Sequence, residues 1–97
     1  MSSIDELFTR VRAENRAALV GYLPAGFPTV EGSIKAIAAM IDGGVDLVEV
    51  GLPYSDPVMD GPTIQAAAET ALAAGIKVDD VFEIVRATAA TGTPTVV

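Results

Sequence analysis

Two carboxylates that could move protons flank a loop rich in Gly and Pro. Glu49 lies near the end of the apolar run 45–50, and Asp60 closes the loop that follows. The sequence has no His and no Cys, which excludes the commonest general base, thiol nucleophiles, disulfides and the usual zinc ligand sets. Acid–base chemistry therefore falls to carboxylates, Tyr or Lys, and no metal site is expected.

Each carboxylate around this loop also has a structural explanation. A Glu at a strand end can be satisfied by backbone amides or solvent. Asp60 stands where an Asp commonly caps a following helix, and Asp56 within 55–57 is typical of a turn. Spacing alone leaves both explanations open, so the surrounding elements have to be considered.

The elements that must position these residues alternate between strands and helices. Thr29 is the expected N-cap of one helix, which Gly43 and Gly44 end, and Pro62 suits the first turn of another. The predicted order is a helix over 3–11, a strand over 17–23, a helix over 29–41, a strand over 45–50, a helix from 62 that Gly75 stops, a helix opened by Asp79 and Asp80, and a strand over 93–97. The expected apolar faces are Val30, Ile34, Ile37, Ala38 and Ile41, then Ile64, Ala68, Ala71 and Leu72, then Val81, Phe82 and Val85.

This order predicts an α/β fold with a parallel sheet. Right-handed crossovers place the helices on one face of the sheet and leave the other face uncovered, although parallel sheets are normally buried on both faces. A barrel solves this by turning the second face inward. We therefore expect residues 1–97 to be the N-terminal segment, strands 1–3 with their helices, of a single TIM (β/α)8 barrel domain of roughly 250 residues.

The barrel hypothesis predicts the direction in which the Glu49 side chain points. Strand residues alternate sides, so Leu47 and Glu49 share one face while Val48 and Val50 share the other. If the valines meet the helices, Glu49 is buried in the barrel interior, at the strand end where barrel enzymes place their active sites.

Composition and charge narrow the class of protein. Thirteen carboxylates against six bases give a net charge of −7, which argues against nucleic-acid and anionic membrane partners. The polar start lacks the features of a signal peptide, and no apolar run approaches the roughly 20 residues of a membrane span. A soluble, cytoplasmic protein is expected.

One stretch of sequence is recognisable as it stands. Residues 47–62 read LVEVGLPYSDPVMDGP, residues 21–28 read GYLPAGFP, and residues 63–65 read TIQ. These segments closely resemble the signature, the first strand and loop, and the third helix of the tryptophan synthase alpha chain family.

The resemblance implies a lyase that cleaves indole-3-glycerol phosphate to indole and glyceraldehyde 3-phosphate by a retro-aldol reaction. It implies that Glu49 is the general acid/base and that Asp60 interacts with the indole N–H. Tyr22 and Ile64 match positions that line the indole pocket, although they could equally be packing residues of the barrel. The positions expected to meet the beta subunit are Pro53, Tyr54, Ser55 and Asp56.

The resemblance further implies an alpha2-beta2 complex whose pyridoxal phosphate belongs to the beta subunit, with no cofactor in this chain. Tyr22 and Tyr54 stand where many members have Phe, Phe27 stands where many have Asp, and Met59 replaces a residue that is often small. The family's phosphate-binding loops are not recognised within these residues, so the 97-residue piece is expected to be inactive alone. The alternatives are another phosphate-handling barrel lyase or isomerase, and an excised, self-associating fragment without activity.

Overall fold

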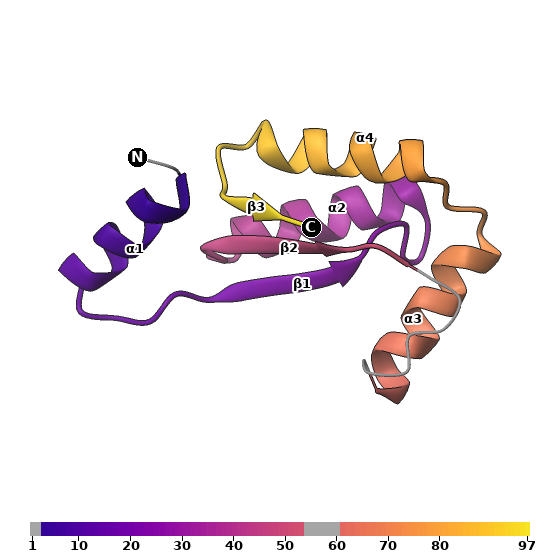
Figure 1. Ribbon diagram of the computed structural model, residues 1–97, viewed down its shortest axis with the longest axis horizontal. Coiled ribbons are helices and arrows are strands. Elements are labelled where there is room, and N and C mark those ends of the chain that lie inside the picture. The colour runs from indigo at the N-terminus through magenta and orange to yellow at the C-terminus, as the bar shows by residue number, and fades with distance from the viewer. Residues whose placement is uncertain (1–2, 54–60) are drawn as a thin grey trace.

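The computed structural model describes residues 3–53 and 61–97 and contains one parallel three-stranded sheet of order β1-β2-β3 (Figure 1). Its elements are α1 (Ser3–Ala13), β1 (Val20–Pro24), α2 (Val30–Asp42), β2 (Leu47–Gly51), α3 (Pro62–Ala73), α4 (Val78–Ala89) and β3 (Thr95–Val96). The predicted alternation of strands and helices is confirmed. Within the described residues, no helix is both long and apolar enough to cross a membrane.

Helices α2 and α4 cover one face of the sheet, side by side (Figure 1). Strand β2 turns Val48 and Val50 towards them, and both residues are fully buried. The core on this face consists of Ala25, Ile37, Val48, Val50, Val81 and Ile84. The prediction that the two valines meet the helices is therefore confirmed.

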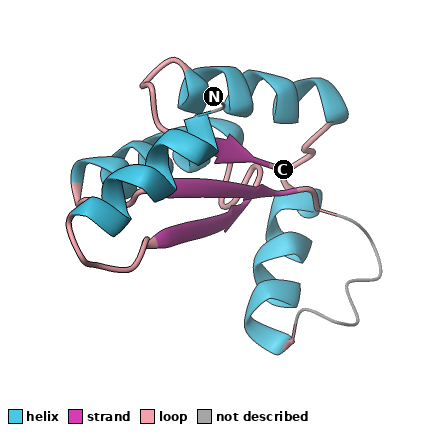
Figure 2. Cartoon of the chain, turned by 60° about the vertical axis from the view of Figure 1, so that its left-hand side comes forward, coloured by secondary structure: helices cyan, strands magenta, loops and turns pink. Residues whose placement is uncertain are grey.

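Of the described helices, α1 covers the opposite face of the sheet, at the N-terminal ends of the strands. There Leu7 and Val11 of α1 pack against Leu47, with Val96 partly buried beside them. The expectation that every helix lies on the other face is wrong for α1, because α1 precedes the first strand and is not a crossover connection. Helix α3 also leaves that layer and points away from the sheet at the C-terminal end of β1 (Figures 1 and 2).

The helix ends follow local chemistry. The Thr29 hydroxyl accepts a 3.0 Å hydrogen bond from the Gly32 amide, as expected of an N-cap, and Gly44 ends α2 with a φ of +110°. Pro62 begins α3 as predicted. The Asp80 carboxylate accepts a 2.9 Å hydrogen bond from the Lys77 amide, which caps the start of α4.

Strand β1 begins and ends later than predicted. The Leu19 amide donates to the Asp46 carboxylate at 2.8 Å, so residues 17–19 stay outside the strand. Pro24 is the last strand residue. Pro24 has no amide hydrogen, and the amide of the next residue, Ala25, donates to the Gly51 carbonyl of β2 at 2.7 Å.

Burial along α4 differs from the predicted apolar face. Phe82 is 62% exposed, whereas Ile84, which was not predicted, is 0% exposed. Val81, Ile84 and Thr88 form the stripe that faces the core, at i, i+3 and i+7. Phe82 follows Val81 by one position and is therefore rotated away from this stripe. On α3, Leu72 is likewise exposed.

Truncation of Ile84 tests this packing. Ile84→Ala should lower the free energy of unfolding by about 2–5 kcal/mol, because a fully buried side chain leaves a cavity. Glu83→Ala, on the exposed side of the same helix, should change it by less than about 0.5 kcal/mol. Equilibrium urea unfolding measures both, and equal stabilities of the two variants would contradict the assignment.

Candidate active site

Glu49 lies on the sheet face that the crossover helices leave open. In the register of the sheet it pairs with Tyr22 of β1 and Val96 of β3, so these three side chains point to the same side. Among the described residues the Glu49 side chain is exposed, so its burial in the interior of a complete barrel stays a prediction. The cause is the open face itself, which α1 covers only around Leu47.

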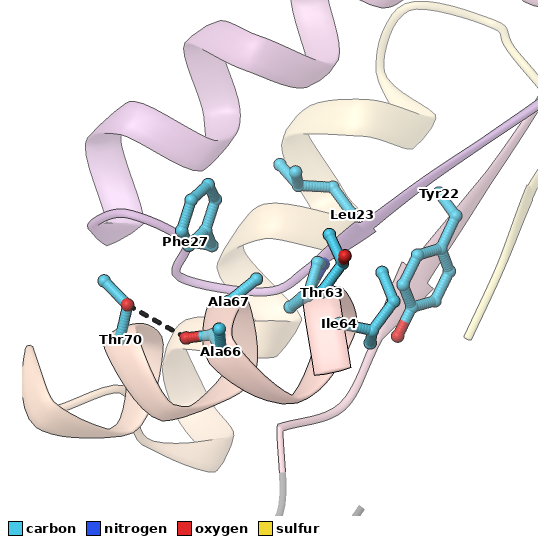
Figure 3. A pocket seen from close by; sticks show the side chains of 9 residues that line it. Tyr22, Leu23, Phe27, Thr63, Ile64, Ala66, Ala67 and Thr70 are labelled. Atoms are coloured by element: carbon cyan, nitrogen blue, oxygen red, sulfur yellow. Dashed lines mark hydrogen bonds between the residues drawn. The ribbon is translucent and has the colours of Figure 1, made fainter. Parts of the chain in front are cut away.

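A pocket of about 340 Å³ lies at the C-terminal end of β1, against α3 (Figure 3). It brings together Tyr22 and Ile64, the two residues expected to line the indole pocket. Figure 3 shows these two side chains near one end of the pocket, with Phe27 and Thr70 at the other. The full lining consists of Tyr22, Leu23, Pro24, Phe27, Thr63, Ile64, Ala66, Ala67 and Thr70. Such a mostly apolar lining suits a flat aromatic ligand.

The position of the Tyr22 ring depends on Gly51. A Cβ atom at Gly51 would lie 2.6 Å from Tyr22 Cζ and 2.9 Å from Cε2, and closer still to the hydroxyl oxygen. Any larger residue would therefore displace the ring. The ring thus leans from β1 across to β2, on the side of the sheet where Glu49 projects.

Several predicted site residues cannot be placed in this geometry. Asp60 lies outside the described residues, as do the predicted interface positions Tyr54, Ser55 and Asp56. Pro53, the first of the interface positions, is half-buried and lines a shallow hollow together with Leu52, Leu72 and Val78. Among residues 3–53 and 61–97, no cluster of three His, Cys, Asp or Glu could hold a metal ion.

The structure adds Asp46, which no sequence pattern marked as a site residue. Its side chain is only 6% exposed, and it accepts hydrogen bonds from Arg16 Nη1 and Nη2 at 2.9 and 3.1 Å and from the Leu19 amide at 2.8 Å. Arg10 of α1 approaches it at 3.4 Å. The Arg16 guanidinium and then the Leu19 amide lower the pKa of Asp46 to about 2.

This ion pair positions the strand that carries Glu49. It joins α1 and the segment before β1 to the start of β2, three residues ahead of Glu49. The sequence signal was an Asp inside the apolar run 45–50, with two Arg residues upstream as partners for it.

Comparison with known proteins extends the likeness over the whole chain. Residues 8–97 match the family described as tryptophan synthase alpha chain. The chain is 62% identical over 96 residues to the tryptophan synthase alpha chain of Salinispora tropica, covering 99% of this chain and 36% of that protein. The corresponding protein of Nocardia farcinica is 58% identical with the same coverage. The chain thus spans about a third of the length of these curated relatives.

Solved structures agree with the sequence relatives. Tryptophan synthase from M. tuberculosis in its aminoacrylate-bound form superposes with a TM-score of 0.93 at 47% identity, covering 98% of this chain and 39% of that one. Tryptophan synthase subunit alpha from Legionella pneumophila str. Paris gives 0.90 at 37% identity, with coverages of 98% and 37%. The three parallel strands and their helices are therefore part of a TIM barrel, as predicted.

The Asp46 ion pair predicts a specific response to acid. Because the pKa of Asp46 falls from the usual 3.8 to about 2 on folding, its ionised form stabilises the folded state fully above about pH 4. That stabilisation is lost as the pH falls towards 2. Asp46→Asn should therefore be less stable than wild type at pH 7, and the difference should shrink between pH 4 and pH 2.

Urea unfolding midpoints across this pH range measure the effect. Arg16→Gln removes the main partner and should give a change in the same direction. A difference between wild type and Asp46→Asn that stays constant down to pH 2 would contradict the role of the ion pair.

Proposed function

The chain belongs to the tryptophan synthase alpha chain family, a lyase family of tryptophan biosynthesis, and we propose that the protein it is part of cleaves indole-3-glycerol phosphate. The products are indole and glyceraldehyde 3-phosphate, released by a retro-aldol reaction. The observation that carries the proposal is the placement of Glu49 on the same sheet face and beside the same aromatic residue, Tyr22, that lines the apolar pocket.

Glu49 is the proposed general acid/base. The reaction requires a proton to be added to indole C3 and a proton to be removed from the glycerol hydroxyl on the neighbouring carbon. The bond between C3 and that carbon then breaks, the hydroxyl carbon becomes the aldehyde, and the bonding electrons return to the indole ring. A single carboxyl group that donates one proton and accepts the other leaves no net change in protons.

Asp60 is proposed to act on the indole nitrogen. Protonation at C3 makes the ring a cationic indolenine, and an anion near the N–H stabilises the positive charge, most strongly where water is excluded. This role comes from the matched sequence position alone, because Asp60 lies outside the described residues.

The indole ring is proposed to bind in the pocket beside Tyr22. The rings of Tyr22 and Phe27 and the aliphatic side chain of Ile64 form much of its wall, and apolar walls favour a flat bicyclic ring. The chain covers about a third of its relatives, and Glu49 is exposed to solvent here. We therefore propose that the 97 residues alone are inactive, since both the phosphate site and the enclosure of Glu49 need further chain.

The proposed partner is the beta subunit of tryptophan synthase, in an alpha2-beta2 complex, and the proposed contact segment is 53–56. Pro53 supports this assignment because it is the second residue after β2, the strand that carries Glu49. We propose that a conformational change in the beta subunit reaches Glu49 through this segment and β2. We propose that pyridoxal phosphate is held by the beta subunit and that the complex is cytoplasmic.

Substitution of Glu49 tests the proposed chemistry. In the complete alpha chain with its beta subunit, Glu49→Gln should lower the rate of indole release by about 10²–10⁴-fold, because the amide cannot exchange protons. Glu6→Gln, an exposed carboxylate on α1 at the opposite end of the strands, is the matched control and should keep the rate. A Glu49→Gln enzyme with the wild-type rate would overturn the assignment.

A further inference from the structure

We propose that Phe27 is a specificity-determining residue, because its ring lies at the end of the pocket that receives C5 and C6 of the indole ring. The size of the Phe27 side chain then sets which substituents on these two carbons the site accepts. The inference rests on the proposed function, since it takes the pocket beside Tyr22 as the place where the indole ring binds.

The pocket is larger than a bare indole ring requires. Its volume of about 340 Å³ falls within the range of about 300–1,000 Å³ that is typical of sites for drug-sized ligands, whereas indole is a single bicyclic ring. Tyr22 and Ile64 lie near one end, and Phe27 and Thr70 lie at the other (Figure 3). Space is therefore left beyond the two residues that are expected to contact the indole ring.

The position of Glu49 determines which half of the indole ring lies at which end. Glu49 is paired with Tyr22 in the sheet, and the two side chains point to the same side, so the proposed general acid/base lies nearer the Tyr22 end than the Phe27 end. Indole C3, the carbon that is protonated, belongs to the five-membered half of the ring. A ring bound with C3 towards Glu49 therefore directs its benzo half, with C5 and C6 foremost, towards Phe27.

The loop that carries Phe27 is held by hydrogen bonds on the side away from the pocket. The Phe27 amide donates to the Pro24 carbonyl at 3.2 Å, and the Gly26 amide donates to the Ser33 hydroxyl at 3.2 Å. Ser33 is fully buried, and its hydroxyl donates in turn to the Val30 carbonyl at 2.8 Å. A side chain on a loop fixed in this way can discriminate by size, because it is not free to move aside.

Helix α3 adds no bulky side chain to this end of the pocket. Past Ile64, its contribution to the lining consists of Ala66, Ala67 and Thr70, and the Thr70 hydroxyl donates to the Ala66 carbonyl at 3.0 Å. Phe27 is thus the one aromatic side chain at this end among the described residues of the lining. A change in its size changes the length of the pocket more than a change at any of the short residues of α3.

A substrate that carries an ethyl group on C6 of the indole ring tests this role, in the complete alpha chain with its beta subunit. The measured quantity is kcat/KM for release of the substituted indole, divided by kcat/KM for release of indole itself. Phe27→Ala should raise this ratio by about 10-fold or more, since a misfit of one methylene group in an apolar pocket changes kcat/KM by about 10–200-fold.

The matched control removes a Phe ring from outside the pocket. Phe82 is exposed on α4 and does not line the pocket, so Phe82→Ala should keep the wild-type ratio. Two milder variants at Phe27 keep an apolar side chain there and cover the case in which Phe27→Ala does not fold. Phe27→Leu shortens the side chain and should raise the ratio, whereas Phe27→Trp enlarges it and should lower the ratio.

The outcomes separate this inference from the function on which it rests. A wild-type ratio in Phe27→Leu and Phe27→Trp, with an active wild type, overturns the role of Phe27 and leaves the proposed function intact. The same holds if these variants change kcat/KM for both substrates by one factor, as a purely structural residue would. A wild type that releases no indole from the unsubstituted substrate overturns the proposed function and this inference together.

Discussion

A parallel sheet is stable when both of its faces are buried, and within residues 3–53 and 61–97 only one face is fully covered. Helices α2 and α4 cover Val48 and Val50, whereas the face that carries Glu49 is closed by α1 at one end only. Among the described residues, the exposure of Glu49 and of the pocket beside Tyr22 both follow from this constraint. A TIM barrel turns such a face inward, where side chains fill the interior.

Stabilising contacts lie at one end of the sheet and the candidate site lies at the other. At the N-terminal end, the Asp46 ion pair and the apolar contacts of α1 fasten the first strands together. At the C-terminal end lie Glu49, Tyr22 and the loop that follows β2. This division of stability and chemistry between opposite ends is the rule in barrel enzymes. The Asp46 ion pair thus positions the strand that carries Glu49 from the end of the sheet opposite to the pocket.

Sequence patterns predicted those features that depend on neighbours in the chain. The Thr29 cap, the start of α3 at Pro62 and the inward direction of Val48 are determined by local hydrogen bonding and by strand alternation. The features missed depend on tertiary contacts. Phe82 is a large apolar residue of the kind expected in a core, but it is exposed. Asp46 binds the Leu19 amide, which lies 27 residues earlier in the chain, at the start of β1.

In the candidate site, too, local patterns predicted some features, whereas others depend on tertiary contacts. Strand alternation predicted the face on which Glu49 lies, but not its exposure, which depends on what covers that face. Tyr22 and Ile64 share a pocket because α3 packs beside β1, a contact that no local pattern encodes. Their assignment as site residues came from resemblance, as did that of Asp60.

The most direct test of the account is complementation between the 97-residue chain and the remainder of the alpha chain, expressed separately, with indole release from indole-3-glycerol phosphate as the measurement. The account predicts no release by the 97-residue chain alone, release after the two parts are mixed, and no release when the 97-residue part carries Glu49→Gln. Release by the 97-residue chain alone, or by the mixture that carries Glu49→Gln, would contradict it.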